Sequence, residues 1–367
     1  MTGRFRPTRV DVDLDAIRHN VKLMKPATAE LLAVVKGDGY GHGALAVARA
    51  ALQGGATWLG VALVEEGLAL RDAGIEAPVL VLSEFPRGAE HDALEAGLTP
   101  SLFTQLGLEA LSGAAAGRSV RVHVKVDTGM HRVGIWPPED AVGYLDRVAA
   151  AGLELEGLWT HFAKSEEDPP TTEGQLTRFL GVVEAARAAG HVPRLLHAAN
   201  SGATIRHPAS HLDLIRVGIA TYGIGPGPGV GDDLGLRPAL VWRSAVTMTK
   251  RLAAGERISY GHRYEMAAEG LVATVPVGYA DGYPRAVSSR ADVLIRGRRC
   301  RVAGAVTMDQ LMVDCGDLGA QPGDEVVLLG PQGNEHVSAW ELAGHADTIA
   351  YEIVTRIGER VPREYAG

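Results

Sequence analysis

Cysteine is nearly absent from this chain of 367 residues, which contains only Cys300 and Cys315. Two cysteines are too few for a disulfide framework, and they lack the clustered His or Cys spacing of a structural zinc site. We therefore expect both cysteines to be buried apolar residues, and we expect no metal site.

Long apolar runs and basic blocks are also missing. No stretch is apolar over the length of a membrane span, and the basic N-terminus has no apolar segment of the signal-peptide kind. The 44 acidic residues outnumber the 36 lysines and arginines, which form no block able to neutralise phosphate backbones. The composition predicts a soluble cytoplasmic protein that binds neither membranes nor nucleic acids.

The chain is longer than one hydrophobic core usually organises, so two domains are expected. Between residue 30 and about 220, short β-branched runs alternate with helix-like stretches such as 43–53, a pattern typical of a parallel sheet. The strand-like runs are 30–35, 58–62, 77–83, 98–102, 121–127, 154–162, 194–200 and 212–218. Eight such units predict a TIM barrel. The alternative, an open doubly wound sheet, is disfavoured because no GxGxxG follows the first strand.

The pattern changes after GIGPGPGVGDDLGLRP at 223–238, where strands follow one another with turns and no intervening helices. This favours a mainly antiparallel β-domain at 236–367 with one late helix, after a barrel at 10–230. The alternating VDVDLD at 10–15 resembles a half-exposed strand that could return to the β-domain. Within the barrel, PPEDAVGYLDRVAAAG at 137–152 has the proline start and glycine end of a helix.

The segment AVVKGDGYGHG at 33–43 places Lys36 at the end of an apolar strand, where barrel enzymes assemble their sites. Burial at such a position disfavours the ammonium form, which makes Lys36 a candidate Schiff-base nucleophile. The alternative is a solvated lysine that begins a loop.

VVKGDGYGHG resembles the cofactor-lysine signature of the alanine racemases, which are pyridoxal-phosphate (PLP) enzymes of fold type III. The likeness extends from DLDAIRHNV at 13–21 to RVPR at 360–363. It includes VKVDTGMHRVG at 124–134, THFA at 160–163, HAANSGA at 197–203, IRVGIATYG at 215–223, ISYGHRY at 258–264, VPVGYADGYPR at 275–285 and TMDQLMVD at 307–314. Segments in this shared order are much more specific than one matching loop.

The resemblance implies a set of cofactor contacts. Lys36 would carry PLP, His161 would pack on its ring, Arg216 would face the ring nitrogen, and Tyr40, Ser201, Gly218 and Ile219 would bind the phosphate. Standing alone, Ser201 would be read as a helix N-cap, and a structural salt bridge is the alternative for Arg216. An arginine cannot protonate the ring as a carboxylate-paired site would, which weakens the cofactor as an electron sink and favours racemisation.

Racemisation needs a base on each face of the α-carbon. The resemblance assigns Lys36 to one face and Tyr260, assisted by His161 and Arg216, to the other. It implies a homodimer in which each site takes its lysine from one subunit and its tyrosine from the partner. Without the resemblance, Tyr260 would be an ordinary tyrosine at a strand end.

The substrate-side positions implied by the resemblance are Arg132 for the carboxylate, Tyr279 at the entrance, and Met308 and Asp309 from the partner subunit. Lys125 matches a lysine that is carbamylated in some relatives. These roles predict interconversion of L- and D-alanine, with D-alanine supplied to peptidoglycan.

Three alternatives remain open at this stage. A PLP decarboxylase would need a cysteine–aspartate pair that neither TMDQ nor the surroundings of Cys315 offers, and a non-catalytic PLP-binding module would leave the β-domain without a purpose. A broader racemase that also accepts serine fits every motif. The chain departs from many relatives at Arg9, where they carry an aromatic residue, and the C-terminal TRIGERVPREY has no obvious phosphate-binding tyrosine.

Overall fold

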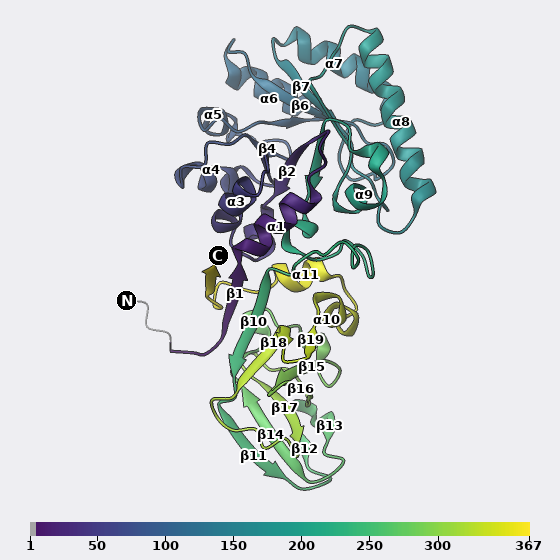
Figure 1. Cartoon of the computed structure of the whole chain (residues 1–367). Coiled ribbons are helices and arrows are strands. Elements are labelled where there is room, and N and C mark those ends of the chain that lie inside the picture. Colours follow the sequence, from purple (N-terminus) through teal and green to yellow (C-terminus); the bar gives the residue numbers. More distant parts are fainter. Residues whose placement is uncertain (1–4) are drawn as a thin grey trace. The chain divides into compact units, whose positions relative to one another are not determined.

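The computed structural model describes residues 5–367, which divide into two compact units (Figure 1). One unit comprises Ala16–Gly39 and Ala44–Arg237. The other comprises the residues up to Asp15, Tyr40–Gly43 and Pro238–Gly367. Each unit has its own sheet system and is described separately.

The first unit is a barrel of eight parallel strands. These are β2 (Glu30–Val34), β3 (Trp58–Val61), β4 (Val79–Val81), β5 (Ser101–Leu102), β6 (Arg121–Lys125), β7 (Glu154–Trp159), β8 (Leu195–His197) and β9 (Leu214–Val217). They pair in the orders β4-β3-β2-β9 and β5-β6-β7-β8. Backbone bonds from Val81 N to Thr99 O and from Arg216 N to Ala199 O, both 2.9 Å, join the two groups. The predicted fold class is confirmed, and the ring excludes an open doubly wound sheet.

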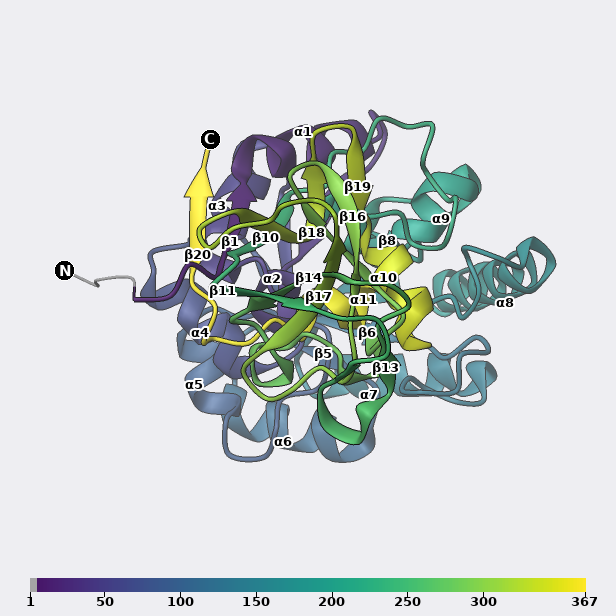
Figure 2. The ribbon, with the colours of Figure 1, turned by 90° about the horizontal axis from the view of Figure 1, so that it is seen from below.

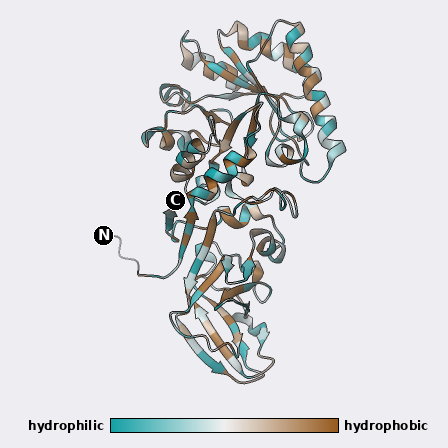
Figure 3. Cartoon of the chain, in the orientation of Figure 1, coloured by the Kyte–Doolittle hydropathy of each residue, from teal (hydrophilic) through white to brown (hydrophobic). Residues whose placement is uncertain are grey.

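Helices follow the barrel strands and cover their outer side. They are α3 (Ala44–Gln53), α4 (Val64–Asp72), α5 (Glu90–Glu95), α6 (Gln105–Ala115), α7 (Ala141–Ala150), α8 (Pro169–Ala188) and α9 (Ser201–Arg206), with α1 (Leu14–Met24) before the first strand. The strands of this unit are mainly hydrophobic, whereas the helices carry both hydrophobic and hydrophilic residues (Figure 3). The sequence thus buries its β-branched runs and leaves one face of each helix in water.

The helix predicted at 137–152 begins later than the sequence indicated. A short 3-10 helix η1 (Pro138–Asp140) leads into α7, and the Trp136–Pro137 peptide bond is cis. Pro138 is tolerated in this first turn because the N–H that proline lacks would have no intrahelical partner there. Gly152, with φ of 73°, ends the segment as predicted.

The second unit is built on one large, mostly antiparallel sheet in the order β11-β14-β17-β16-β15-β18-β10-β1-β20, with β19 beside β18. Its strands are β1 (Arg9–Asp13), β10 (Leu240–Ala245), β11 (Met248–Leu252), β14 (Gly270–Val275), β15 (Asp292–Ile295), β16 (Arg298–Val302), β17 (Leu311–Gly316), β18 (Glu325–Gln332), β19 (Glu335–Val337) and β20 (Arg363–Ala366). β12 (Arg257–Ile258) pairs separately with β13 (Tyr264–Glu265). β1 pairs antiparallel with β10 and parallel with β20, which lies beside it in Figure 2.

The prediction of one late helix in this unit is wrong, because the structure has two. α10 (Ala339–Ala346) ends where Asp347 adopts a left-handed conformation with φ of 56°. α11 (Ala350–Thr355) starts shortly afterwards. Asp tolerates this conformation better than most residues do, so Asp347 can end a helix without glycine.

Both cysteines are buried and free, as predicted. No helix within residues 5–367 is both long and apolar enough to cross a membrane. In the same part of the chain, no group of three or more His, Cys, Asp or Glu side chains is arranged to hold a metal ion.

Candidate active site

Lys36 follows β2 at the C-terminal end of the barrel, where barrel enzymes assemble their sites. Behind it, Gly37, Asp38 and Gly39 have φ values of 61°, 51° and 61°. Glycine adopts this left-handed region freely and aspartate tolerates it. A Cβ on Gly39 would also lie only 3.1 Å from the Ala44 Cα. The glycines after Lys36 therefore allow a tight left-handed turn directly behind the lysine.

Glu66 on α4 holds this turn in place. Its Oε1 accepts a hydrogen bond from Gly37 N at 2.6 Å, and its Oε2 accepts one from Ala62 N at 2.8 Å. Burial and the nearby Arg132 lower the pKa of Lys36, while Glu66 raises it. The net lowering favours the neutral, nucleophilic amine over the solvated lysine of the alternative interpretation.

Arg216 on β9 is buried and anchored by four acceptors. Its guanidinium donates to Thr160 O at 2.7 Å, Ala198 O at 3.0 Å, His197 Nδ1 at 3.0 Å and His161 Nδ1 at 3.2 Å. Burial lowers the pKa of Arg216 to about 9, so the group stays charged at pH 7. Both histidines must accept from it, which places their protons on Nε2. Arg216 has histidine and carbonyl partners instead of the carboxylate of a structural salt bridge.

Positive charge is concentrated at this end of the barrel. Burial, Arg132 and Arg216 lower the pKa of Lys125 to about 7. Burial, Arg216 and Lys125 hold the pKa of His161 well below its usual value. These mutual shifts place Lys36, Lys125, Arg132, His161 and Arg216 within electrostatic reach of one another, in a region suited to an anion.

The loop that carries Arg132 is shaped by Asp127, at the end of β6. Asp127 Oδ1 accepts hydrogen bonds from the backbone N–H groups of Gly129, Met130 and His131, at 2.9, 3.0 and 3.1 Å. This carboxylate fixes the loop while the Arg132 side chain remains exposed. A substrate carboxylate could approach such an arginine from solvent.

Ser201 joins two strand ends of the barrel. Its Oγ accepts from Gly218 N at 2.9 Å and from Ala220 N at 3.4 Å. Its hydroxyl hydrogen is left to donate. Asn200, and not Ser201, caps α9. Ile219 begins the short helix η3 (Ile219–Tyr222), and a first helical N–H has no intrahelical partner. The Gly218 N–H is therefore taken by Ser201, which leaves the Ser201 hydroxyl and the Ile219 N–H as donors.

The remaining predicted positions belong to the second unit. Tyr40 is buried there, its ring centroid 6.2 Å from that of Tyr351 on α11, with the ring planes tilted by 48°. Burial raises the pKa of Tyr40, so its hydroxyl keeps its proton and can donate.

Tyr260 lies on an unusually constrained turn. Ser259, Gly261 and His262 around it have φ values of 64°, 73° and 49°. Ser259 Oγ donates to Ala305 O at 2.7 Å. Such conformations cost on the order of 1–3 kcal/mol each for non-glycine residues and persist only where the surroundings enforce them. The Tyr260 side chain is nevertheless 74% exposed. A turn with a constrained backbone thus presents an exposed tyrosine.

Tyr279 and Met308 are carried by two turns that are bonded together. Tyr279 N donates to Thr307 O and Ala280 N donates to Met308 O, both at 3.0 Å. A Cβ on Gly278 would come within 2.2 Å of Met308 O, so only glycine fits this approach. The predicted entrance residues therefore have fixed backbones and exposed side chains.

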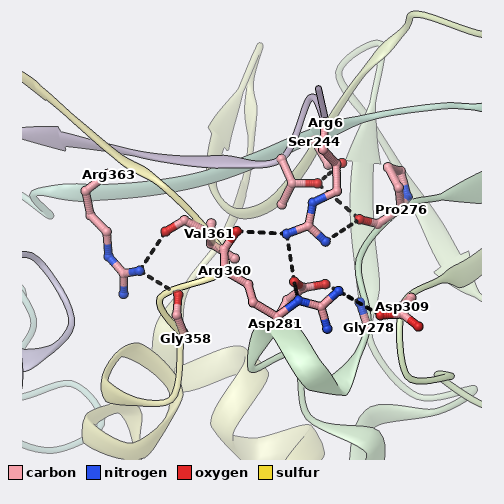
Figure 4. Close-up of polar contacts among 11 residues, drawn as sticks. Arg6, Ser244, Pro276, Gly278, Asp281, Asp309, Gly358, Arg360, Val361 and Arg363 are labelled. Atoms are coloured by element: carbon pink, nitrogen blue, oxygen red, sulfur yellow. Dashed lines mark hydrogen bonds and ion pairs between the residues drawn. The ribbon is translucent and has the colours of Figure 1, made fainter. Parts of the chain in front are cut away.

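A buried carboxylate, Asp281, ties these turns to distant segments (Figure 4). It accepts from Arg6 at 2.8 Å and from Gly278 N at 3.0 Å, and it lies 3.6 Å from Arg360 Nε. Arg360 also donates to Asp309 Oδ1 at 2.7 Å. Arg360 thereby links Asp309 to Asp281, which lies in the turn that carries Tyr279.

The structure thus divides the predicted site residues between the two units. The barrel holds Lys36, Lys125, Arg132, His161, Ser201, Arg216, Gly218 and Ile219, and the second unit holds Tyr40, Tyr260, Tyr279, Met308 and Asp309.

The sequence reasoning missed Glu66, Asp281, Tyr351 and Arg360. Tyr351 could have been singled out, because only 5% of residues are aromatic. It also lies just before TRIGERVPREY, the segment in which a phosphate-binding tyrosine was sought. The three charged residues look like any surface charge in the sequence, since each also has a distant partner, 29 to 275 positions away along the chain.

Two family models match successive parts of this chain. Residues 12–226 match the model of the alanine racemase N-terminal domain, and residues 239–365 match that of the alanine racemase C-terminal domain. An alanine racemase from Symbiobacterium thermophilum is 51% identical over 372 residues, covering 99% of this chain and 98% of that protein.

Solved structures give the same result. The alanine racemase of a D-cycloserine-producing Streptomyces lavendulae aligns with a TM-score of 0.94 at 41% identity, covering 100% of this chain and 98% of that one. The Bacillus anthracis alanine racemase with bound L-Ala-P aligns with a TM-score of 0.93 at 38% identity, covering 100% and 96%. With both domain models matched in order along almost the whole length, the chain belongs to the alanine racemase family of isomerases.

Proposed function

We propose that this chain interconverts L- and D-alanine with PLP as its cofactor, in the cytoplasm, where the D-alanine would enter peptidoglycan precursors. The observation that carries the proposal is the cationic barrel end, where the lowered pKa of Lys36 coincides with the buried, charged Arg216. PLP requires a neutral amine with which to form a Schiff base. Its phosphate and the carboxylate of the amino acid require fixed cations nearby.

The barrel residues fit PLP. Lys36 supplies the amine, and the Ser201 hydroxyl and Ile219 N–H supply donors for the phosphate. Arg216 has its donors fixed by Thr160 O and Ala198 O and would face the ring nitrogen. When bound, PLP supplies an electron sink that acidifies the α-hydrogen of the amino acid joined to it.

Two bases are proposed, because inversion needs a proton removed on one face and delivered on the other. Lys36 Nζ would take up the proton on one face, because its lowered pKa favours the neutral amine that can accept one. Tyr260 of the partner subunit would serve the other face. Arg216 fixes the proton of His161 on Nε2, and that N–H is available to stabilise a tyrosine oxygen that has lost its proton.

Substrate selection is proposed for four residues. Arg132 would bind the substrate carboxylate, while Tyr279, Met308 and Asp309 would restrict the space beside it. A wall of large side chains excludes long substrates by overpacking, whereas a smaller substrate only loses contacts. Alanine is the expected substrate, and serine is the first competitor to test.

A homodimer is proposed from the exposed side chains of the second unit. Tyr260, Met308 and Tyr279 are 74%, 54% and 40% exposed although the turns that carry them are held by backbone hydrogen bonds. Ordered turns that present large side chains to solvent are typical of surfaces covered by another chain. A second copy of this chain would supply that cover and complete each site.

The test of the activity is exchange of the α-proton in deuterated water, followed by NMR with L-alanine, D-alanine and both serine enantiomers. We expect Lys36→Ala to lose the visible absorbance of the bound cofactor together with activity. We expect Tyr260→Phe to keep the absorbance and lose racemisation in at least one direction. Lys164→Ala, at a surface lysine 3.9 Å from Glu167, is the matched control and should behave as wild type. Release of carbon dioxide from the substrate would indicate a decarboxylase instead.

The shared site has its own test. Lys36→Ala and Tyr260→Ala subunits are denatured, mixed in equal amounts and refolded. In a two-fold dimer with shared sites, each mixed dimer has one site with both native residues, so activity should return to about a quarter of wild type. If both residues came from the same chain, no site would be intact and the mixture would stay inactive.

A further inference from the structure

A chain of buried polar side chains continues from Arg216 through the interior of the barrel. His197 Nε2 lies 2.9 Å from His123 Nδ1, and His123 Nε2 lies 3.5 Å from Glu156 Oε2. Glu156 stands near the start of β7, at the end of the barrel opposite Lys36. His123, His197 and Glu156 are all buried, and the proposed function gives His123 and Glu156 no role.

The hydrogen-bond directions in this chain are determined. Because Arg216 can only donate, His197 Nδ1 must accept, so the single proton of a neutral His197 is on Nε2 and is donated to His123 Nδ1. His123 therefore carries its proton on Nε2, directed at Glu156. The 3.5 Å contact is long for a hydrogen bond, and Nε2 has no other polar partner within residues 5–367.

The charge states support this direction. Burial lowers the pKa of His123 and of His197, so both rings are neutral at pH 7. Burial alone would raise the pKa of Glu156, but its contacts with His123 and Arg194 lower it to about 2. Glu156 is thus a carboxylate, and it accepts from Arg194 at 3.0 Å and from Arg121 at 3.3 Å.

Packing prevents the rings from turning to other partners. A Cβ on Gly157 would lie 2.4 Å from His123 Nδ1, so the ring occupies the space that a side chain would need. Trp159 stacks on His197 with ring centroids 5.5 Å apart and planes 7° from parallel. Arg216 lies over the same Trp159 ring, 4.8 Å from its centroid. A change in the orientation or tautomer of either histidine would therefore alter the contacts of Arg216.

We propose that Glu156 and His123 are positioning residues for racemisation, because they impose on His197 the tautomer that Arg216 requires. Glu156 accepts a hydrogen bond from His123 Nε2–H, so His123 Nδ1 carries no proton and must accept. His197 therefore keeps its proton on Nε2, where it donates to His123 Nδ1. If that order were reversed, His197 would present N–H to an arginine N–H, and Arg216 would have to move. The inference rests on the proposed function, in which Arg216 faces the cofactor ring.

The decisive variant is Glu156→Gln, which keeps the size of the side chain. If the amide oxygen accepts from His123, the NH₂ group faces Arg194 and Arg121. If the oxygen instead accepts from the arginines, the NH₂ group donates to His123 and reverses the direction of the hydrogen bonds through His123 and His197. The control is Glu30→Gln. Glu30 also accepts from Arg194, at 3.0 Å, and lies at the same end of the barrel, and its other side-chain donors are Thr57 and Trp58.

Two readouts are compared between these variants. ¹⁵N NMR of histidine-labelled holoenzyme reports the tautomer of His197, and steady-state assays report kcat in both directions at matched cofactor loading. We expect Glu156→Gln to shift His197 away from the Nε2–H form and to lower kcat at least tenfold relative to Glu30→Gln. Glu156→Asp, which restores a carboxylate, should recover the tautomer and part of kcat.

An unchanged His197 tautomer, or equal kcat in Glu156→Gln and Glu30→Gln, would overturn the proposal. If Glu156→Gln does not fold, the comparison of Glu156→Asp with Glu30→Gln decides in the same way: a carboxylate that keeps the tautomer supports the proposal, and loss of the tautomer despite the carboxylate refutes it. The NMR readout needs no turnover, so it is separate from a failure of the proposed function, which wild-type protein without alanine racemisation would reveal.

Discussion

Lys125 offers a direct quantitative test of the electrostatics at the barrel end. Its side chain is buried, its Nζ lies 4.4 Å from the Trp159 ring centroid, and its pKa is lowered from 10.5 to about 7. Between these two pH values the unfolded chain binds more protons than the folded one, so stability rises with pH. Integrating this difference gives a cost of about 4 kcal/mol at pH 7, which disappears above pH 10.5.

The perturbation is Lys125→Met, which removes the charge and keeps a flexible side chain against Trp159. In buffer free of carbon dioxide at pH 7, we expect the variant to be more stable than wild type by up to about 4 kcal/mol in urea unfolding. The difference should shrink by up to about 1.4 kcal/mol per pH unit as the pH rises. Lys164→Met, at an exposed lysine, should show neither effect.

A neutral amine also reacts with carbon dioxide, so the same pKa supports the proposal that Lys125 becomes carbamylated. Added ¹³C-bicarbonate should then give a carbamate signal in wild-type protein, and this signal should be absent from Lys125→Met. The new negative charge would lie near Arg132 and Arg216 and should stabilise wild type. A Lys125→Met protein that is no more stable than wild type at pH 7, with no dependence on pH, would refute the electrostatic reasoning.

Three further predictions concern cofactor binding and folding. Ser201→Ala should weaken PLP binding at least tenfold in a fluorescence titration, since a hydrogen bond to a charged group is worth about 1.5–3 kcal/mol, and unchanged affinity would remove Ser201 from the phosphate site. Gly39→Ala forces a Cβ into a turn with φ of 61° and should lower stability by about 1 kcal/mol or more; a circular-dichroism melt matching wild type would contradict this. Phe179→Ala, at a fully buried position on α8, should cost about 3–5 kcal/mol in urea unfolding, and a loss below about 1 kcal/mol would mean that the core collapses around the gap.

Much of the fold could be predicted from local pattern. The eight barrel strands lie in short, mainly apolar runs, and each was expected within a few residues of its observed position. Helix boundaries were less certain. Asp347 ends α10 in a left-handed conformation that glycine usually provides, so the division between α10 and α11 had no clear sequence signal.

The candidate site was predictable where chemistry and chain position coincide. Lys36 follows a buried strand and precedes a glycine-rich turn, and both features can be recognised in the amino-acid sequence. Ser201 was ambiguous because a serine before a helix resembles an N-cap. Only the structure shows Asn200 in that role and Ser201 bonded to Gly218. Tyr260 stays a proposal, since its place opposite Lys36 depends on a second subunit.

By itself, the sequence determined the periodicities that build a barrel and a β-domain, and the motifs that place a reactive lysine at a strand end. These are local properties, set by the residues themselves and their immediate neighbours. The tertiary structure alone decided which partner each carboxylate meets: Glu66 the turn after Lys36, Asp281 the Arg6 side chain, and Glu156 the His123 ring. A charge on a strand or helix has no distinctive pattern, and its pKa and direction of proton donation depend on burial and on partners far along the chain.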